Sequence, residues 1–130
     1  ISTENQYILG YTIHQSATDT NTLPTHLESL KANLGRMPDT LVADAGYGSE
    51  ENYEYLEKND VEAFVKYQYF HLEQSKKWKD DPYRTENLQY DENDDSYTCP
   101  ADKKMRFFGE KVKITDNGFR QVKRLYQAEN

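Results

Sequence analysis

The sequence has 130 residues, of which 35% are hydrophobic and 13% aromatic, and its formal net charge is −7 at pH 7. This length suits a single domain with a modest core, and the aromatic content excludes a disordered chain. One cysteine excludes an internal disulfide framework and a multi-cysteine zinc site, and the net negative charge argues against a general nucleic-acid binder.

The chain contains no apolar stretch near the ~20 residues of a membrane helix, and no signal peptide precedes the first predicted element. We therefore expect a cytosolic protein without a membrane partner. The first residue is Ile1, without an initiator methionine, and this predicts an excised fragment of a longer protein.

The first half of the chain alternates between strand and helix patterns. Residues 6–15 place apolar and polar side chains alternately, which predicts a strand. Leucines spaced three and four residues apart from Leu23 to Leu34 predict an amphipathic helix that ends at Gly35. Residues 40–44 read as a short buried strand.

A second helix and a third strand complete this pattern. Ser49 is a good N-cap for a helix that ends at Asn59, and residues 61–70 read as a strand. The order strand, helix, strand, helix, strand predicts an α/β fold. Its crossover connection predicts parallel pairing between residues 41–44 and 61–65.

After residue 70 the pattern becomes polar and β-rich. Residues 71–86 predict part helix and part loop, broken at Pro82. Residues 87–100 predict two short strands around an acidic turn that we expect to be a solvated tip. The last thirty residues predict a long hairpin, because Asn117-Gly118 favours a type I′ turn. We therefore expect two regions, residues 1–70 and residues 71–130.

Asp44 is the first candidate site residue. It ends the predicted strand at residues 40–44 and precedes a loop with Gly46 and Gly48, which would let the backbone approach a phosphate. An aspartate in this place suits Mg²⁺, which prefers carboxylate oxygen. The alternative is a turn aspartate that accepts hydrogen bonds from nearby amides.

A second candidate is the basic end of the chain. Residues 1–100 carry 8 Lys and Arg against 19 Asp and Glu, whereas residues 101–130 carry 8 against 4. Alternation along the hairpin predicts a strip of cations for phosphate contacts, with a solvated face as the alternative. The predicted nucleic-acid contacts are Lys111, Lys113, Arg120, Lys123 and Arg124.

Four segments in order resemble a known family. They are GYTIHQSATDTNTLPTHLESL, LVADAGYGSEENYEYLEKN, YTCPADKKM and RLYQAEN. Together they resemble the DDE-type transposases of bacterial insertion sequences, over essentially the whole chain. The most specific part is Asp-Ala-Gly-Tyr-Gly-Ser, which begins at Asp44.

The resemblance implies a partial RNase H-like fold in residues 1–70 and a β-rich insertion in residues 71–130. It implies that Asp44 is the second of three catalytic carboxylates, which together hold two divalent ions, normally Mg²⁺. Gly46 and Tyr47 would shape this site. The implied partner is double-stranded DNA, at the element ends and at the target, with a homo-oligomer as a further expectation.

The resemblance also implies that two carboxylates lie outside this sequence. The first aspartate would precede Ile1 and the final glutamate would follow Asn130, so we expect this fragment to be inactive alone. One alternative is a non-catalytic module, derived from a transposase, that binds DNA or protein through the basic hairpin. Another is an RNase H-like nuclease that acts on RNA–DNA hybrids or junctions.

Overall fold

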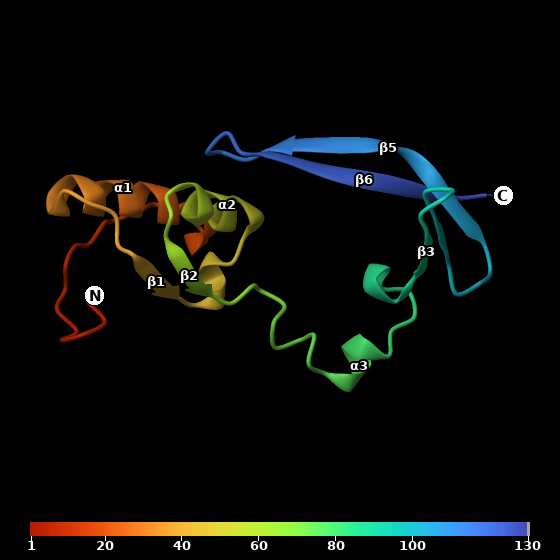
Figure 1. Cartoon of the computed structure of the whole chain (residues 1–130), viewed down its shortest axis with the longest axis horizontal. Helices are drawn as coiled ribbons and strands as arrows, with labels where there is room; N and C mark the ends of the chain where they lie inside the picture. The colour runs from red at the N-terminus through yellow and green to blue at the C-terminus, as the bar shows by residue number, and fades with distance from the viewer. Residues whose placement is uncertain (130) are drawn as a thin grey trace. The chain divides into compact units, whose positions relative to one another are not determined.

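The computed structural model describes residues 1–129, which form two compact units (Figure 1). One unit is Ile1–His71, and the other begins at Leu72. The first contains a two-stranded parallel sheet, and the second contains a four-stranded antiparallel sheet. The mixed α/β class predicted from the sequence is therefore confirmed.

The helices of the first unit begin and end at the predicted signals. After the short helix η1 (Asp19–Asn21), helix α1 (Leu23–Leu34) ends at Gly35, whose φ of 76° is in the left-handed region that favours glycine. Helix α2 (Glu50–Lys58) begins after Ser49, whose side chain accepts a hydrogen bond from the Asn52 amide at 3.2 Å. Local sequence chemistry therefore sets both helices.

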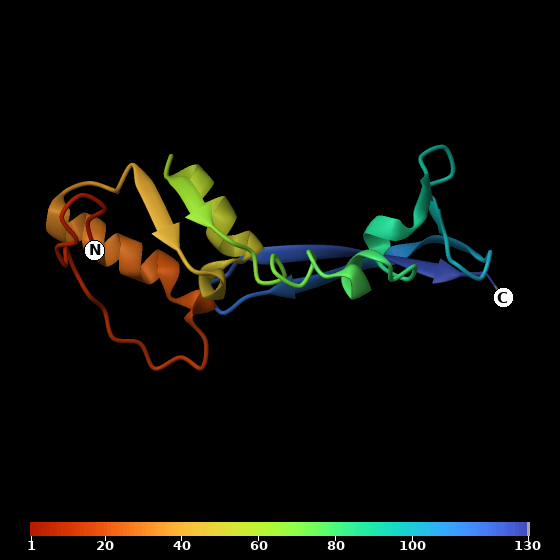
Figure 2. The ribbon, with the colours of Figure 1, turned by 90° about the horizontal axis from the view of Figure 1, so that it is seen from below.

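The two strands of the first unit run in parallel, as Figure 2 shows. Strand β1 (Thr40–Ala43) pairs with β2 (Glu62–Val65), in the register that places Val42 beside Phe64. The predicted strand at residues 61–70 is therefore too long. Because β1 ends at Ala43, the chain beyond Val65 has no neighbouring strand to pair with among the described residues.

The core of this unit lies between the two helices and one face of the sheet. Four buried residues form it, and Leu41 and Val65 pack against them; the four are Leu23, Leu27, Leu56 and Val61. The opposite face of the sheet carries Val42 and Phe64, which are 65% and 57% exposed. One face of the sheet is thus buried and the other is open in the described chain.

The predicted strand at residues 6–15 is wrong, because this segment has no regular secondary structure. A strand needs a neighbour for its backbone hydrogen bonds, and no described strand pairs with this segment. Its apolar side chains stay exposed, with Tyr11 at 80% and Ile13 at 88%. The order strand, helix, strand, helix, strand therefore loses its first strand.

The second unit begins with short helices and continues as an antiparallel sheet in the order β3-β4-β5-β6. Its elements are α3 (Lys76–Lys79), η3 (Thr85–Asn87), β3 (Gln89–Asp91), β4 (Ser96–Thr98), β5 (Lys104–Ile114) and β6 (Arg120–Ala128). Strands β5 and β6 form the long hairpin predicted from the sequence (Figure 1).

The turn of this hairpin differs from the predicted type I′ turn. The Gly118 amide donates to the Thr115 carbonyl at 2.9 Å, so the turn is centred on Asp116 and Asn117. Gly118 has a φ of 84°, but Asn117 does not have the positive φ that a type I′ turn requires. The last strand pair is Ile114 with Arg120, so the loop is longer than two residues and glycine follows the turn instead of forming its centre.

Candidate functional site

Asp44 lies at the carboxyl end of β1 and is exposed. It caps the short helix η2 (Ala45–Tyr47), and its Oδ1 accepts a hydrogen bond from the Gly46 amide at 2.8 Å. Both sequence interpretations therefore describe part of its geometry. Asp44 is a turn aspartate through one oxygen, and it presents an exposed carboxylate at the end of a parallel strand.

Asn52 holds the loop that carries Asp44. It is 1% exposed, and its side-chain amide donates to the carbonyls of Thr20 at 2.8 Å and Tyr47 at 2.7 Å. The hydroxyl of Thr20 in turn donates to the Gly46 carbonyl at 3.1 Å. These bonds join η2 to η1. Asn52 was not among the predicted site residues, although an asparagine on the first turn of a helix, on the core-facing side, was a usable signal.

Gly48 places this loop directly against the chain that follows β2. A Cβ atom at Gly48 would lie 2.4 Å from the Lys66 carbonyl oxygen and 2.7 Å from the Tyr67 Cα. The sequence predicted that Gly48 would let the backbone approach a phosphate. Gly48 is buried, however, so its backbone is not open to such a ligand. The missing side chain serves close packing between two backbone segments.

Gly46 and Tyr47, which were expected to shape the site, have different surroundings. Gly46 is exposed and supplies the amide that holds Asp44 Oδ1. Tyr47 is half-buried and packs against the core, while its carbonyl accepts from Asn52. Gly46 therefore contacts the candidate carboxylate directly, whereas Tyr47 anchors the loop that carries it to the core.

A cavity of about 890 Å³ separates the N-terminal segment from α1 and β1. Its walls include Tyr11, His14, Leu27 and Leu41. At its edge the hydroxyl of Thr12 lies 2.8 Å from His26 Nδ1 and 2.8 Å from His14 Nε2. Burial, followed by the charge of His14, lowers the pKa of His26 below its ordinary value of 6.5.

The lowered pKa of His26 predicts a pH effect on stability. The folded protein binds fewer protons at His26 than the unfolded chain does in mild acid. The stability that neutral His26 contributes to the folded state is therefore complete above about pH 6.5, and it is lost as the pH falls through the lower pKa of the folded state. We expect His26→Gln to flatten the dependence of the unfolding free energy on pH below about 6.5, measured by urea unfolding. An equal flattening by His71→Gln, whose ring packs against Phe70, would contradict this assignment.

Asp44 has the right chemistry for one metal ligand. Mg²⁺ binds carboxylate oxygen, and of the two carboxylate oxygens of Asp44 only Oδ1 accepts a hydrogen bond from another described residue. Within residues 1–129, however, no group of three or more His, Cys, Asp or Glu side chains could hold a metal ion. The described chain therefore fits one ligand position of a metal site and not a complete site.

The basic hairpin does not form one strip of five cations. Lys111 lies directly opposite Lys123, and Lys113 lies on the same face of the ribbon. Arg120 and Arg124 belong to the other face. Arg124 is also committed to Asp95, with Nη2 to Oδ2 at 2.5 Å. The five predicted nucleic-acid contacts therefore lie on two faces of the hairpin, three lysines on one and two arginines on the other.

The acidic turn between β3 and β4 is bound to the sheet and is not a solvated tip. Asp94 pairs with Lys104 and with Arg106, and hydrogen bonds from these cations lower its pKa. Asp95 accepts from the hydroxyls of Tyr90 and Tyr126, both at 2.7 Å, which lowers the pKa of Asp95. The hydrogen bond between Asp95 and Tyr126 also raises the pKa of Tyr126 to about 12. These contacts occupy the carboxylates of Asp94 and Asp95.

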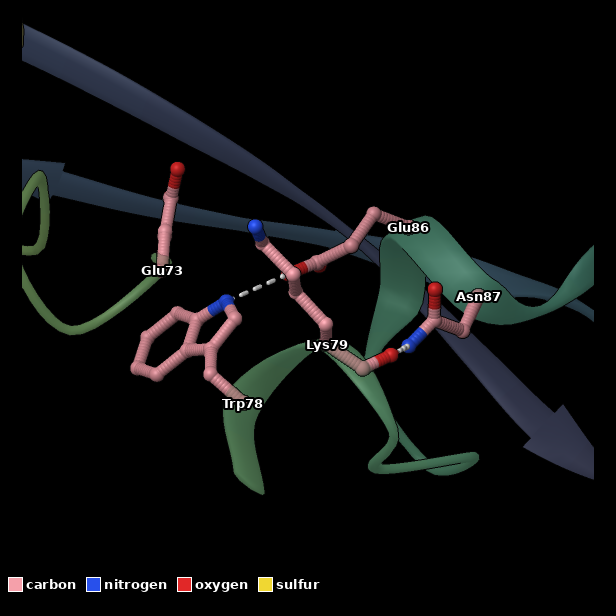
Figure 3. A pocket seen from close by; sticks show the side chains of 5 residues that line it. All are labelled: Glu73, Trp78, Lys79, Glu86 and Asn87. Atoms are coloured by element: carbon pink, nitrogen blue, oxygen red, sulfur yellow. Dashed lines mark hydrogen bonds between the residues drawn. The ribbon is translucent and has the colours of Figure 1, made fainter. Parts of the chain in front are cut away.

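The second unit also has an open pocket of about 440 Å³ around Trp78 (Figure 3). Trp78 Nε1 donates to Glu86 at 3.1 Å, and the Asn87 side chain donates to the Lys79 carbonyl at 3.0 Å. The Arg84 guanidinium stacks on the Trp78 ring. These contacts tie α3 to η3, so the tryptophan has a structural role in a segment that contains little regular structure.

An exposed carboxylate at the carboxyl end of a parallel strand is the arrangement in which α/β proteins place catalytic and ligand-binding groups. The chain matches the family described as Transposase DDE domain over residues 1–128. The chain therefore belongs to the DDE transposase family, as its sequence predicted. This family acts on DNA in transposition and in general uses a divalent metal ion such as Mg²⁺.

The other comparisons found no relatives for this chain: no curated protein and no solved structure matches it. In the described part of the chain, no helix has both the length and the apolar character needed to cross a membrane.

Proposed function

We propose that residues 1–70 are part of an RNase H-like catalytic core and that residues 71–130 are an insertion within it. In this proposal Asp44 is the second of three carboxylates of an insertion-sequence transposase that cleaves and joins DNA in the bacterial cytoplasm. The observation that carries the proposal is the exposed Asp44 carboxylate at the end of β1, in a chain that belongs to the DDE transposase family.

The open edge of the sheet supports a larger core. Within the described residues β1 pairs only with β2, so its other edge is unpaired. The cavity of about 890 Å³ lies beside this strand, and Val42 and Phe64 leave one sheet face uncovered. An RNase H-like sheet would continue at the free edge of β1 and bring a strand with the first carboxylate beside Asp44.

Asp44 would act as a fixed oxygen ligand. The Gly46 amide holds Oδ1, while Asn52 fixes the loop, so the second oxygen is presented with little freedom of movement. Divalent ions, when bound, supply charge stabilisation at the phosphate and activation of water or of a DNA 3′-hydroxyl. A single carboxylate does not hold two ions, so we expect this chain alone to be inactive.

The test uses the complete transposase that contains this chain. Asp44→Asn keeps the size of the side chain and the hydrogen bond from Gly46, but it removes the charge of the proposed ligand. We expect loss of Mg²⁺-dependent cleavage of duplex DNA that carries the element ends. Asp60→Asn is the matched control, because Asp60 is exposed and its φ of 54° suits asparagine.

Normal cleavage by Asp44→Asn would reject the catalytic proposal. The binding-module alternative would then lead, since it is supported by the lysines on one face of the β5–β6 hairpin. The same assay with an RNA–DNA hybrid tests the nuclease alternative, because a transposase is expected to prefer duplex DNA with element ends. Preference for the hybrid would favour the nuclease.

A further inference from the structure

The hairpin of β5 and β6 is a ribbon with two chemically different faces. Residues directly opposite in an antiparallel pair lie on the same face, and the register beyond the irregularity at Phe107 and Gly109 is regular. One face, which we call the lysine face, consists of Gly109, Lys111, Lys113, Gln121, Lys123 and Leu125. The opposite face consists of Glu110, Val112, Ile114, Arg120, Val122 and Arg124.

The lysine face contains an unfavourable pair. Lys111 lies directly opposite Lys123, so their Cβ atoms are on the order of 5 Å apart, and like charges in this position destabilise a sheet. Lys113 adds a third positive charge two residues along β5, and no acidic side chain belongs to this face. All three lysines are exposed.

The opposite face shows the arrangement expected when stability alone decides the residues. Glu110 lies directly opposite Arg124, and Val112 lies opposite Val122. Arg124 is further bound to Asp95 and stacks over the Phe107 ring at 4.9 Å. The two faces of the ribbon thus differ, because among these six pairs directly opposed like charges occur only on the lysine face.

We propose, on the basis of the proposed function, that the lysine face is a docking surface for the phosphate backbone of duplex DNA. Three positive charges on a face that contains no acidic residue complement a polyanion, and binding relieves the repulsion between Lys111 and Lys123. The surface belongs to the second unit, whereas Asp44 belongs to the first, so the proposal adds a DNA contact that is separate from the candidate catalytic carboxylate.

The composition of the face favours duplex over single-stranded DNA. Proteins that bind single strands stack the bases on aromatic rings, and none of the six residues on the lysine face is aromatic. Lysines on exposed strands instead contact backbone phosphates, which position a protein without reading sequence. A two-stranded ribbon is also narrow enough to enter the major groove of B-DNA.

The test measures binding of the full chain to a fluorescent duplex of about 20 base pairs, by anisotropy over a series of salt concentrations. We expect the double variant Lys111→Gln, Lys123→Gln to bind about tenfold more weakly or worse and to reduce the salt slope by about 2, since each phosphate contact contributes about 1. Lys123→Gln and Arg120→Gln are compared as a charge-matched pair, because each removes one positive charge, the first from the lysine face and the second from the other face.

Folding is monitored in the same samples by thermal unfolding. Removing the repulsion between Lys111 and Lys123 is expected to leave the melting temperature unchanged or higher, so weaker binding cannot then be assigned to misfolding. Absence of duplex binding by the parent chain, unchanged binding by the double variant, or an equal loss in Lys123→Gln and Arg120→Gln would each overturn the proposal. None of these outcomes concerns cleavage, so the Asp44→Asn assay tests the proposed function separately.

Discussion

Gly48→Ala is expected to destabilise the first unit by about 3 kcal/mol, at the upper end of the cost of overpacking. The backbone angles of Gly48 are accessible to alanine, so the cost is steric. The added Cβ would lie 2.4 Å from the Lys66 carbonyl oxygen, 2.7 Å from the Tyr67 Cα and 2.9 Å from the Tyr53 hydroxyl. Two of these atoms belong to the backbone and cannot move away as a flexible side chain does.

The measurement is hydrogen exchange of the slowest amides of α1 and α2, which report the unfolding free energy of this unit. Gly46→Ala is the control, since its Cβ would approach only the Asp44 carboxylate, at 3.0 Å from Oδ1. We expect this control to stay within about 1 kcal/mol of the parent chain. Equal effects of the two substitutions would show that the backbone contact at Gly48 is unimportant.

Asn52→Ala is expected to destabilise the same unit by about 2 to 3 kcal/mol. The substitution leaves a small cavity and removes the donors that satisfy the Thr20 and Tyr47 carbonyls. The Asn52 Oδ1 atom has no partner among the described residues, so the amide nitrogen supplies the stabilising contacts of this side chain. Exchange of the amides between residues 44 and 48 should rise more than exchange in the middle of α1.

Asn52→Asp separates the hydrogen bonds from the packing, because it has nearly the same shape. Burial and the two facing carbonyls disfavour its charged form, so its folded pKa would be raised above the unfolded value of about 3.9. The variant is then most stable, relative to the parent, below about pH 3.9, and this stability is lost as the pH rises through the raised folded pKa. A constant difference between the two proteins across this range would contradict the assigned hydrogen bonds.

Gly48 and Asn52 explain why the exposed Asp44 keeps a defined position. Among the described residues, the Asp44 side chain accepts one hydrogen bond, from the Gly46 amide. The loop that carries Asp44 is fixed by the hydrogen bond from the Asn52 side chain to the Tyr47 carbonyl and by the close packing of Gly48 against the backbone of Lys66 and Tyr67. Substitutions that leave Asp44 intact are therefore expected to impair any activity that depends on its placement.

Local signals in the sequence were sufficient for several elements. The leucine spacing and Gly35 predict α1, the Ser49 cap predicts α2, and the alternation around Asn117-Gly118 predicts the β5–β6 hairpin. Each signal acts within a few residues, through a cap, a helical period or a turn, so it does not depend on distant parts of the chain. The position of Asp44 at a strand end follows from the same local patterns.

Tertiary structure decided what the local patterns left open. The alternation in residues 6–15 is a true strand pattern, but a strand forms only where another strand supplies hydrogen bonds, and none does so in the described chain. The burial of Asn52, the close packing at Gly48 and the separation of Lys111 from Arg120 likewise depend on segments that meet only in the fold. Pairing register and burial are long-range properties, and residue order along the chain does not encode them locally.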